Sequence, residues 1–317
     1  MDRARPSVTV LVPVYNSEGS LRLLVERLEP VLKRLAGAFE LLLVNDGSRD
    51  GSWGVVRELA RAKPWVRGIT MMRNYGQHNA LLCGIRAARG ELIVTMDDDL
   101  QHPPEELEKL LLALDADTDV VYGTPAKERH GLLRDLASRV TKLALEKSMG
   151  AETASKVSAF RVFRAELRRA FENYQSQFVS IDVLLTWGTT RFKAIDVRHD
   201  PRTIGVSNYT FKKLLTHAMN MMTGFSTLPL QLASWMGFAF TVLGLALVVF
   251  LVVRYFVEGS DVKGFTFLAS LIAIFSGAQL FALGILGEYL ARMHFRMMDR
   301  PTYTVRDEIG GGLGSKS

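Results

Sequence analysis

The chain has 317 residues, of which 48% are hydrophobic and 23% are charged, and its formal net charge is +6. This composition excludes a disordered tail protein and a collagen-like repeat, and the single cysteine excludes an internal disulfide. The mean hydropathy is only +0.11, although the sequence pI is near 9.4. A mild average of this kind is compatible with a very apolar segment beside a polar one, so the distribution along the chain has to be considered.

The first part of the chain alternates between β-rich runs and stretches with helical spacing. We predict strands at 7–15, 39–45, 66–72, 91–96 and 120–124, and helices at 18–36, 52–62, 77–88 and from Pro103 onward. Repeated strand–helix units build a mostly parallel sheet with helices on both faces, so the predicted fold class is α/β. Such sheets bind ligands at the carboxyl ends of their strands.

Polar clusters stand at four of these predicted strand ends. They are Tyr15-Asn16, Asn45-Asp46-Gly47-Ser48, Arg73-Asn74-Tyr75-Gly76 and Asp97-Asp98-Asp99. The sequence has no G-x-G-x-x-G and no G-x-x-x-x-G-K-[ST], which disfavours a dinucleotide oxidoreductase and a P-loop kinase.

The aspartate triplet is the clearest candidate for a metal site. Adjacent carboxylates repel one another in the absence of a cation, and strand alternation places Asp97 and Asp99 on the same side. Gln101 adds a neutral oxygen, and an all-oxygen set suits Mg²⁺ or Mn²⁺ bridging to a diphosphate. A solvated acidic loop with a helix-capping aspartate is the alternative that the triplet alone leaves open.

Two stretches without a charged residue, 231–253 and 265–287, follow in the second part of the chain. Each is longer than the roughly 20 residues that a membrane-spanning helix needs, and the short polar segment between them predicts an antiparallel hairpin. The N-terminus has no apolar signal-peptide core. Basic residues lie before the first stretch and after the second, which predicts a multi-pass protein of the inner (plasma) membrane with the N-terminal domain and both termini in the cytoplasm.

The segment before the first apolar stretch, 208–225, also has apolar residues at helical spacing, beside Lys212 and Lys213. An amphipathic helix in the membrane interface and a core helix of the soluble domain both fit this pattern. We therefore expect a cytosolic domain at 1–207, an interfacial helix at 208–226, a transmembrane hairpin at 227–291 and a cytosolic tail at 292–317, flexible from Gly310 onward.

Four strings together resemble the GT-A family 2 glycosyltransferases that use a polyprenyl phosphate acceptor. They are Pro13-Val14-Tyr15-Asn16, Val44-Asn45-Asp46-Gly47-Ser48, Arg73-Asn74-Tyr75-Gly76-Gln77-His78 and Asp97-Asp98-Asp99-Leu100-Gln101-His102-Pro103-Pro104. The third string is especially similar to the undecaprenyl-phosphate aminoarabinose transferase branch. The resemblance covers nearly the whole chain and implies a GT-A (Rossmann-like) nucleotide-sugar domain with an interfacial helix and two transmembrane helices.

The resemblance also implies an activity and its partners. It implies inverting, metal-dependent transfer of a sugar from a nucleotide sugar, with UDP favoured over GDP, to polyprenyl (undecaprenyl) phosphate at the cytoplasmic membrane face. Mg²⁺ or Mn²⁺ would be the cofactor and membrane lipids further partners. A homotetramer is expected by resemblance, and no nucleic-acid partner is expected.

Site residues follow from the same resemblance. The catalytic residues would be Asp97, Asp99, Arg161 and Arg202, and the metal ligands Asp97, Asp99 and Gln101. The donor nucleotide site would comprise Pro13, Tyr15, Asn16, Asp46, Arg73, Asn74, Gly76 and Asp98. The acceptor phosphate would meet Arg161, Arg202, Ser207 and Lys212, because a guanidinium matches phosphate oxygens in a bidentate manner.

Three positions depart from the family pattern. Ser17 stands where an acidic residue is frequent, Ala159 replaces an aspartate, and Asn208 replaces a lysine whose phosphate contact Lys212 or Lys213 would supply. Two other functions stay open: the same fold acting on another membrane lipid, and a membrane scaffold that has lost catalysis. A lipid hydroxyl acceptor would need a general base, for which the sequence offers no clear candidate beyond the aspartates.

Overall fold

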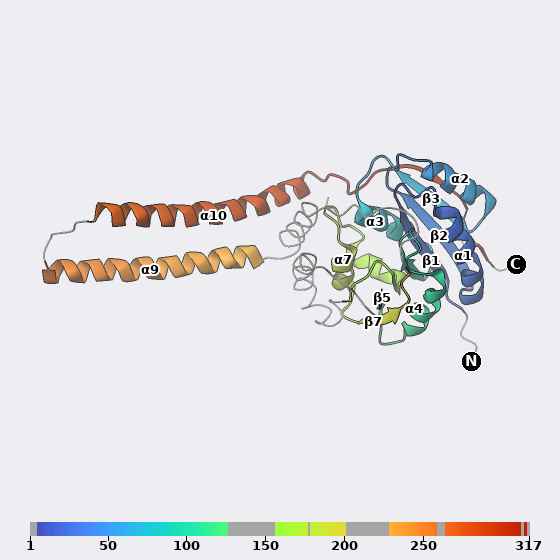
Figure 1. Cartoon of the computed structure of the whole chain (residues 1–317), viewed down its shortest axis with the longest axis horizontal. Helices are drawn as coiled ribbons and strands as arrows, with labels where there is room; N and C mark the ends of the chain where they lie inside the picture. The colour runs from blue at the N-terminus through green and yellow to red at the C-terminus, as the bar shows by residue number, and fades with distance from the viewer. Residues whose placement is uncertain are drawn as a thin grey trace. The chain divides into compact units, whose positions relative to one another are not determined.

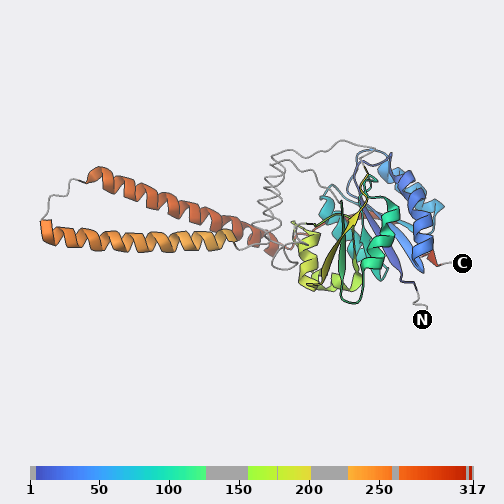
Figure 2. The same cartoon turned by 60° about the horizontal axis from the view of Figure 1, so that its bottom comes forward.

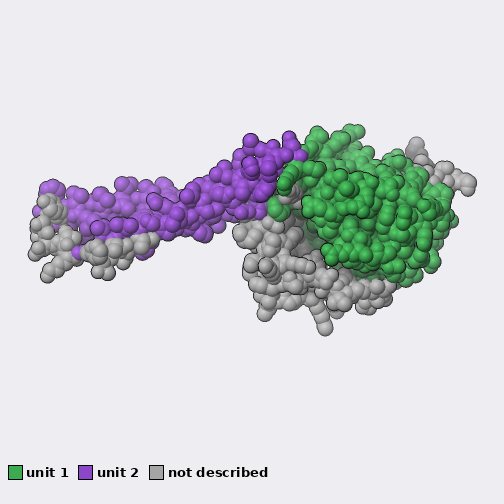
Figure 3. Space-filling view, turned by 90° about the horizontal axis from the view of Figure 1, so that it is seen from above, with its two compact units in different colours: residues 1–217, 300–317 green, residues 218–299 purple. Residues whose placement is uncertain are grey.

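The computed structural model describes residues 5–125, 156–176, 178–200, 228–258, 264–311 and 314–315. The chain divides into two units, which Figure 3 shows in different colours. The first comprises Met1–His217 and Arg300–Ser317, and the second Ala218–Asp299. The last residues of the chain therefore belong to the N-terminal folding unit, although the whole second unit separates them from it in sequence.

Four parallel strands form the centre of the sheet in the first unit, in the order β4-β1-β2-β3. Their bounds are Val8–Val14 (β1), Ala38–Asn45 (β2), Val66–Met71 (β3) and Leu92–Thr95 (β4). These strands are buried almost throughout, because helices cover both faces. Each lies within two residues of the strand that the sequence predicts.

Strands with other directions extend this parallel centre into a mixed sheet of nine strands among the described residues. Beyond β4, antiparallel β6 (Arg161–Arg164) separates β4 from β5 (Val120–Pro125), and β7 (Phe192–Val197) forms the edge. β5 is predicted from the sequence, whereas β6 and β7 are not. Their short length and charged residues hide the alternation that identifies a strand.

Helices cover the two faces of the sheet in two groups (Figures 1 and 2). One face carries α1 (Leu21–Leu35), α2 (Ser52–Ala62) and α4 (Leu107–Ala113), which follows the short 3-10 helix η1 (Pro104–Glu106). The other face carries α3 (Gln77–Ala87), α7 (Ile181–Gly188) and the 3-10 helix η2 (Ala165–Phe171). The buried residues of α1 recur every three or four positions, so one side of this helix faces the sheet: Leu21, Leu24, Val25, Leu28, Val31 and Leu32.

The C-terminal residues differ from the flexible tail that the sequence suggests. β8 (Val305–Ile309) pairs antiparallel with β3, and β9 (Gly314–Ser315) pairs antiparallel with the first residues of β2. Gly310 links them with a φ of +102°, and a Cβ there would lie 2.4 Å from the Val66 carbonyl oxygen. Glycine therefore allows the chain to turn against β3, and the tail becomes part of the sheet.

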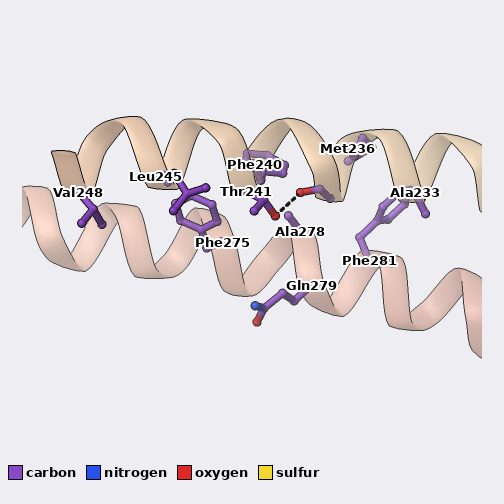
Figure 4. Close-up of a pocket in the computed structure, with 13 residues that line it drawn as sticks. Ala233, Met236, Phe240, Thr241, Leu245, Val248, Phe275, Ala278, Gln279 and Phe281 are labelled. Atoms are coloured by element: carbon purple, nitrogen blue, oxygen red, sulfur yellow. Dashed lines mark hydrogen bonds between the residues drawn. The ribbon is translucent and has the colours of Figure 1, made fainter. Parts of the chain in front are cut away.

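The second unit contains two long helices that run side by side, α9 (Leu228–Glu258) and α10 (Phe265–Met297). Stretches Pro229–Arg254 and Ile274–Phe295 are long and apolar enough to cross a membrane, and their side chains are not buried within the protein. Figure 4 shows the apolar groove between them, where the rings of Phe240 and Phe275 lie 5.4 Å apart. The two apolar helices agree with the predicted hairpin.

The predicted interfacial helix at 208–226 lies outside the described residues. The boundaries proposed around it stay predictions.

Candidate active site

The carboxyl ends of β1, β2 and β3 lie level with one another, and β4 ends slightly earlier, opposite Leu11. The strand register pairs Val14 with Asn45, Asn45 with Thr70, and Leu11 with Thr95. The residues that follow these strands therefore meet along one edge of the sheet, as the sequence predicts. Tyr15 is 45% exposed at this edge and Pro13 is half-buried, so both are accessible to a ligand.

Asp46 holds the loop that follows β3. Its carboxylate accepts hydrogen bonds from the backbone N–H of Tyr75 at 2.7 Å and of Gly76 at 2.8 Å. Asp46 is 3% exposed, and burial raises the pKa of its carboxyl while the two N–H donors lower it. Gly76, at φ +97°, adopts a conformation that glycine allows at little cost. Asp46 thereby shapes the loop, and its predicted contact with a nucleotide stays a prediction.

Arg73 and Asn74, in that same loop, are exposed and accessible to a ligand. The Arg73 guanidinium lies 4.6 Å from the centre of the Tyr75 ring, a cation–π arrangement that orients the arginine.

Asn16 joins the loops that follow β1 and β2. Its backbone N–H donates to the Ser48 hydroxyl at 3.0 Å, and its side-chain oxygen accepts from the Arg49 N–H at 2.9 Å. Its φ of +56° lies in the left-handed region, which asparagine tolerates better than most residues. The structure therefore gives Asn16 a part in building the edge, whereas the sequence predicted only a ligand contact.

The aspartate triplet follows β4 and contacts two other segments, the start of α3 and the loop that follows β1. The Gln77 side chain donates to Asp97 Oδ1 at 2.8 Å, and the side chain of Ser17 forms a hydrogen bond with Asp98. The Gln101 N–H donates to Asp99 Oδ1 at 3.1 Å. These contacts of Gln77 and Ser17 were not predicted from the sequence, although Gln77 belongs to one of the four strings that carry the family resemblance.

Negative charge is concentrated at this triplet. Burial, together with the charges of Asp97 and Asp99, raises the pKa of Asp98 to about 6, although the Ser17 side chain acts in the opposite direction. Among the described residues, no three His, Cys, Asp or Glu side chains converge as a metal site. Mg²⁺ ordinarily takes one or two carboxylates, water and substrate phosphates. Asp97, Asp99 and Gln101 are half-buried and carry oxygens of the kind that Mg²⁺ or Mn²⁺ accepts, and their role as metal ligands stays a prediction.

The loop beyond the triplet rests on a small aromatic cluster. The His102 ring stacks on Phe160 at 5.1 Å and meets the His199 ring at 4.9 Å. Burial lowers the pKa of His102 to about 4, so this imidazole is neutral at pH 7. The Asp200 N–H donates to the Gln101 carbonyl at 2.8 Å, which attaches the end of β7 to the predicted metal loop.

Arg161 requires a correction. The resemblance placed its guanidinium on the acceptor phosphate, but Arg161 is 2% exposed and forms a buried ion pair with Asp182. Its Nε also donates to Thr95 Oγ1 at 3.0 Å, and the Tyr122 hydroxyl donates to the same Asp182 carboxylate at 3.0 Å. The guanidinium is thus engaged inside the sheet and is not accessible to an external phosphate. The other predicted acceptor residues, Arg202, Ser207 and Lys212, lie outside the described residues.

Comparison with known proteins identifies the family. The sequence profile of glycosyl transferase family 2 matches residues 9–174. Two proteins named undecaprenyl-phosphate 4-deoxy-4-formamido-L-arabinose transferase are similar to the chain along almost its full length. That of Photorhabdus laumondii is 34% identical over 306 residues, with 96% of this chain and 94% of the relative covered. That of Shewanella sediminis is 35% identical over 308 residues, with 96% and 93% covered. The chain belongs to glycosyl transferase family 2.

Solved structures support the fold of this glycosyltransferase. Glucosyl-3-phosphoglycerate synthase from Mycobacterium tuberculosis, in complex with Mn²⁺, UDP-glucose and phosphoglyceric acid, aligns with a TM-score of 0.53 and 18% identity. The alignment covers 69% of this chain and 78% of the synthase. The similarity confirms the predicted GT-A-like α/β fold of the glycosyltransferase.

Proposed function

We propose that this glycosyltransferase transfers a sugar from a nucleotide sugar to undecaprenyl phosphate at the cytoplasmic face of the membrane. The observation that carries the proposal is the edge at which Asp97 and Asp99 stand beside the Asp46-held loop, in a chain with two apolar helices. The names of the full-length relatives support the acceptor and make 4-deoxy-4-formamido-L-arabinose the first sugar to test. The UDP in the related synthase structure supports a UDP-linked donor.

The chemistry of a phosphate acceptor fits the side chains at this edge. A phosphate monoester is already anionic at pH 7, so its oxygen attacks the anomeric carbon without a strong general base. Ala159 stands where the family often has an aspartate, and an anionic acceptor makes that carboxylate dispensable. We propose a single displacement with inversion at the anomeric carbon.

Charge neutralisation is the main requirement of such a reaction, because donor and acceptor are both anions. A divalent ion held by Asp97, Asp99 and Gln101 would stabilise the leaving diphosphate by charge. The exposed Arg73 would add positive charge on the donor side. For the acceptor side we propose Arg202, Ser207 and Lys212, while Arg161 is omitted because its guanidinium is paired inside the sheet.

Membrane topology follows from the path of the chain. β8 lies after α10 in sequence and pairs with β3 of the N-terminal domain. This pairing supports a hairpin whose two ends emerge on the same side of a bilayer. The basic residues that flank the hairpin favour the cytoplasmic side for the domain and both termini. An acceptor phosphate at the membrane surface would then be within reach of the domain.

The decisive experiment uses the purified full-length protein in detergent with undecaprenyl phosphate and a panel of UDP- and GDP-linked sugars, including the formamidoarabinose donor. Product lipid is identified by its mass, with Mg²⁺, Mn²⁺ or EDTA in parallel. We expect a glycosylated lipid only with a divalent ion present. Asp99→Ala is expected to abolish the product, whereas Asp117→Ala, at an exposed aspartate outside the site, is the matched control.

The same assay tests the two alternatives. Transfer to a diacylglycerol lipid but not to undecaprenyl phosphate would contradict the proposed acceptor. Metal-dependent nucleotide binding without any product would favour a scaffold that has lost catalysis. We also propose a homotetramer, which the mass of the detergent-solubilised protein would test.

A further inference from the structure

A buried hydroxyl connects the end of β4 to the segment formed by residues 158–161. We propose that Thr95 is a positioning residue, whose hydroxyl fixes the loop formed by residues 96–102, here named the triplet loop, on that segment. The inference rests on the proposed function, because it takes the aspartates of the triplet loop as metal ligands. It also gives Arg161 a role, since this guanidinium then acts on the metal site through Thr95 and not on an acceptor.

The Thr95 hydroxyl both donates and accepts a hydrogen bond. It donates to the Ala159 carbonyl at 2.7 Å and accepts from Arg161 Nε at 3.0 Å. Thr95 is the last residue of β4, is 1% exposed, and lies opposite Arg161 in the antiparallel pairing of β4 with β6. The position of Thr95 is therefore fixed two residues before Asp97, where the chain leaves the sheet.

Arg161 can orient this hydroxyl because its own guanidinium is held in place. Its Nη1 pairs with the Asp182 carboxylate, to which the Tyr122 hydroxyl also donates. The donors of a guanidinium form a rigid planar fork, so the pair with Asp182 also fixes the direction in which Nε points. The side chain is 2% exposed, and loss of the Thr95 hydroxyl would therefore leave Nε without a partner inside the sheet.

The far end of the triplet loop rests on the same segment. The His102 ring stacks on the ring of Phe160, which is fully buried, and the Phe160 carbonyl accepts from the Gly123 N–H of β5 at 2.9 Å. The segment thus supports the triplet loop at both ends, by a hydrogen bond before Asp97 and by a ring contact after Gln101. A loop held at both ends has fewer conformations available, which keeps its carboxylates in one arrangement.

Thr9 provides a matched control in the same sheet. Its buried hydroxyl donates to Glu40 Oε1 at 2.8 Å and accepts from the Gly90 N–H at 2.8 Å, and it lies near the start of β1, away from the triplet loop. Thr95→Val and Thr9→Val each remove one donated and one accepted hydrogen bond at nearly constant volume, so both should lower the unfolding temperature. Only the first should loosen the triplet loop, and Thr95→Ser should leave it unchanged.

The first measurement is hydrogen exchange at the amides of residues 97–102 in the full-length protein in detergent, without metal or nucleotide. We expect exchange about three- to tenfold faster in Thr95→Val, the range that corresponds to one net hydrogen bond, and near the wild-type rate in Thr95→Ser and Thr9→Val. Thr95→Cys keeps a weaker donor and acceptor, so it should give an intermediate rate, and it replaces the valine variant if that variant does not fold. Unchanged exchange in the Thr95 variants, or equal acceleration in Thr9→Val, would overturn the inference.

The second measurement is Mn²⁺ binding in the presence of UDP or GDP, followed by the free Mn²⁺ signal in electron paramagnetic resonance, and then steady-state transfer. We expect Thr95→Val to raise the Mn²⁺ Kd by about three- to tenfold, with the acceptor KM unchanged at saturating Mn²⁺ and with rescue by Thr95→Ser. A normal Mn²⁺ Kd with a raised acceptor KM would overturn the inference. A wild-type protein that transfers no sugar would contradict the proposed function, and the exchange data would still decide whether Thr95 fixes the triplet loop.

Discussion

The Arg161 guanidinium and the Asp182 carboxylate form an ion pair inside the sheet, with side-chain exposures of only 2% and 12%. The pair links β6 to the beginning of α7, and Tyr122 on β5 donates to the same carboxylate. Burial, with the nearby negative charge of Asp182, raises the pKa of Tyr122 well above its usual value, so this phenol stays neutral and donates. The pair thus holds together the three elements beside the predicted metal loop.

Breaking this pair should destabilise the protein strongly. Asp182→Asn leaves a buried guanidinium without its counter-charge, which costs about 3–5 kcal/mol of unfolding free energy. Thermal unfolding of the detergent-solubilised protein measures the loss. Arg161→Met combined with Asp182→Leu should cost less than the single change, because no charge stays buried. A stable Asp182→Asn variant with only a raised acceptor KM would instead return Arg161 to the acceptor site.

Gln77 should control metal affinity, although it is not a predicted ligand. Its amide donates to Asp97 Oδ1 at 2.8 Å and thereby orients that carboxylate. Partners of this kind ordinarily change metal affinity by about 10- to 100-fold. We expect Gln77→Ala to raise the Mn²⁺ concentration for half-maximal activity by about that factor, with much of the activity restored at saturating Mn²⁺. Lost activity that added metal does not restore would contradict this role.

Cys83 should be inert in the folded protein. The thiol is 2% exposed, and burial raises its pKa to about 12. Thiolate is the reactive form, so maleimide or iodoacetamide at pH 8 should leave the native protein unlabelled and label it fully in denaturant. Rapid labelling of the native protein, detected by intact mass, would show that the helix α3 opens locally.

Because Cys83 is expected to be unreactive in the folded protein, a cysteine introduced elsewhere can be labelled selectively to measure the membrane topology. Ser260→Cys, between the two apolar helices, should react with a membrane-impermeant maleimide in intact spheroplasts. Ser317 is the last residue of the sequence and belongs to the same folding unit as the N-terminal domain. Ser317→Cys should therefore react only after the membrane is permeabilised. The reverse labelling pattern would invert the proposed orientation, and labelling of both from outside would exclude a spanning hairpin.

The sequence predicted the centre of the fold well because its signals are local. Strands β1 to β5 appear in the sequence as short apolar runs, and helices α1 to α3 as stretches with helical periodicity. The two long apolar helices are recognisable from the length of their uncharged stretches. The triplet Asp97–Asp99 and the loops that follow the strands were likewise visible as polar clusters at strand ends. Their convergence on one edge followed from the parallel topology.

Other parts of the structure depend on partners far away in sequence. β8 contains Arg306, Asp307 and Glu308 in a five-residue strand and carries no apolar alternation, yet β3 provides it with backbone hydrogen bonds and Arg67 provides a counter-charge for Glu308. β6 is shorter still, with four residues, and its first residue is the buried Arg161. A strand of this kind forms because of the neighbouring strands and side chains in the folded protein, and the residues around it in the sequence carry no signal of these partners.

The amino-acid sequence by itself determined the class of the protein: an α/β domain, a strand-end aspartate cluster and two membrane-length helices, all encoded in residues near one another. Only the tertiary structure decided what individual charged residues do. An arginine in a motif presents the same charge whether it faces a ligand or a buried aspartate, and for Arg161 the decisive neighbour is Asp182, 21 residues away. The same reason makes a tail residue, Thr304, a backbone hydrogen-bond partner of Met72.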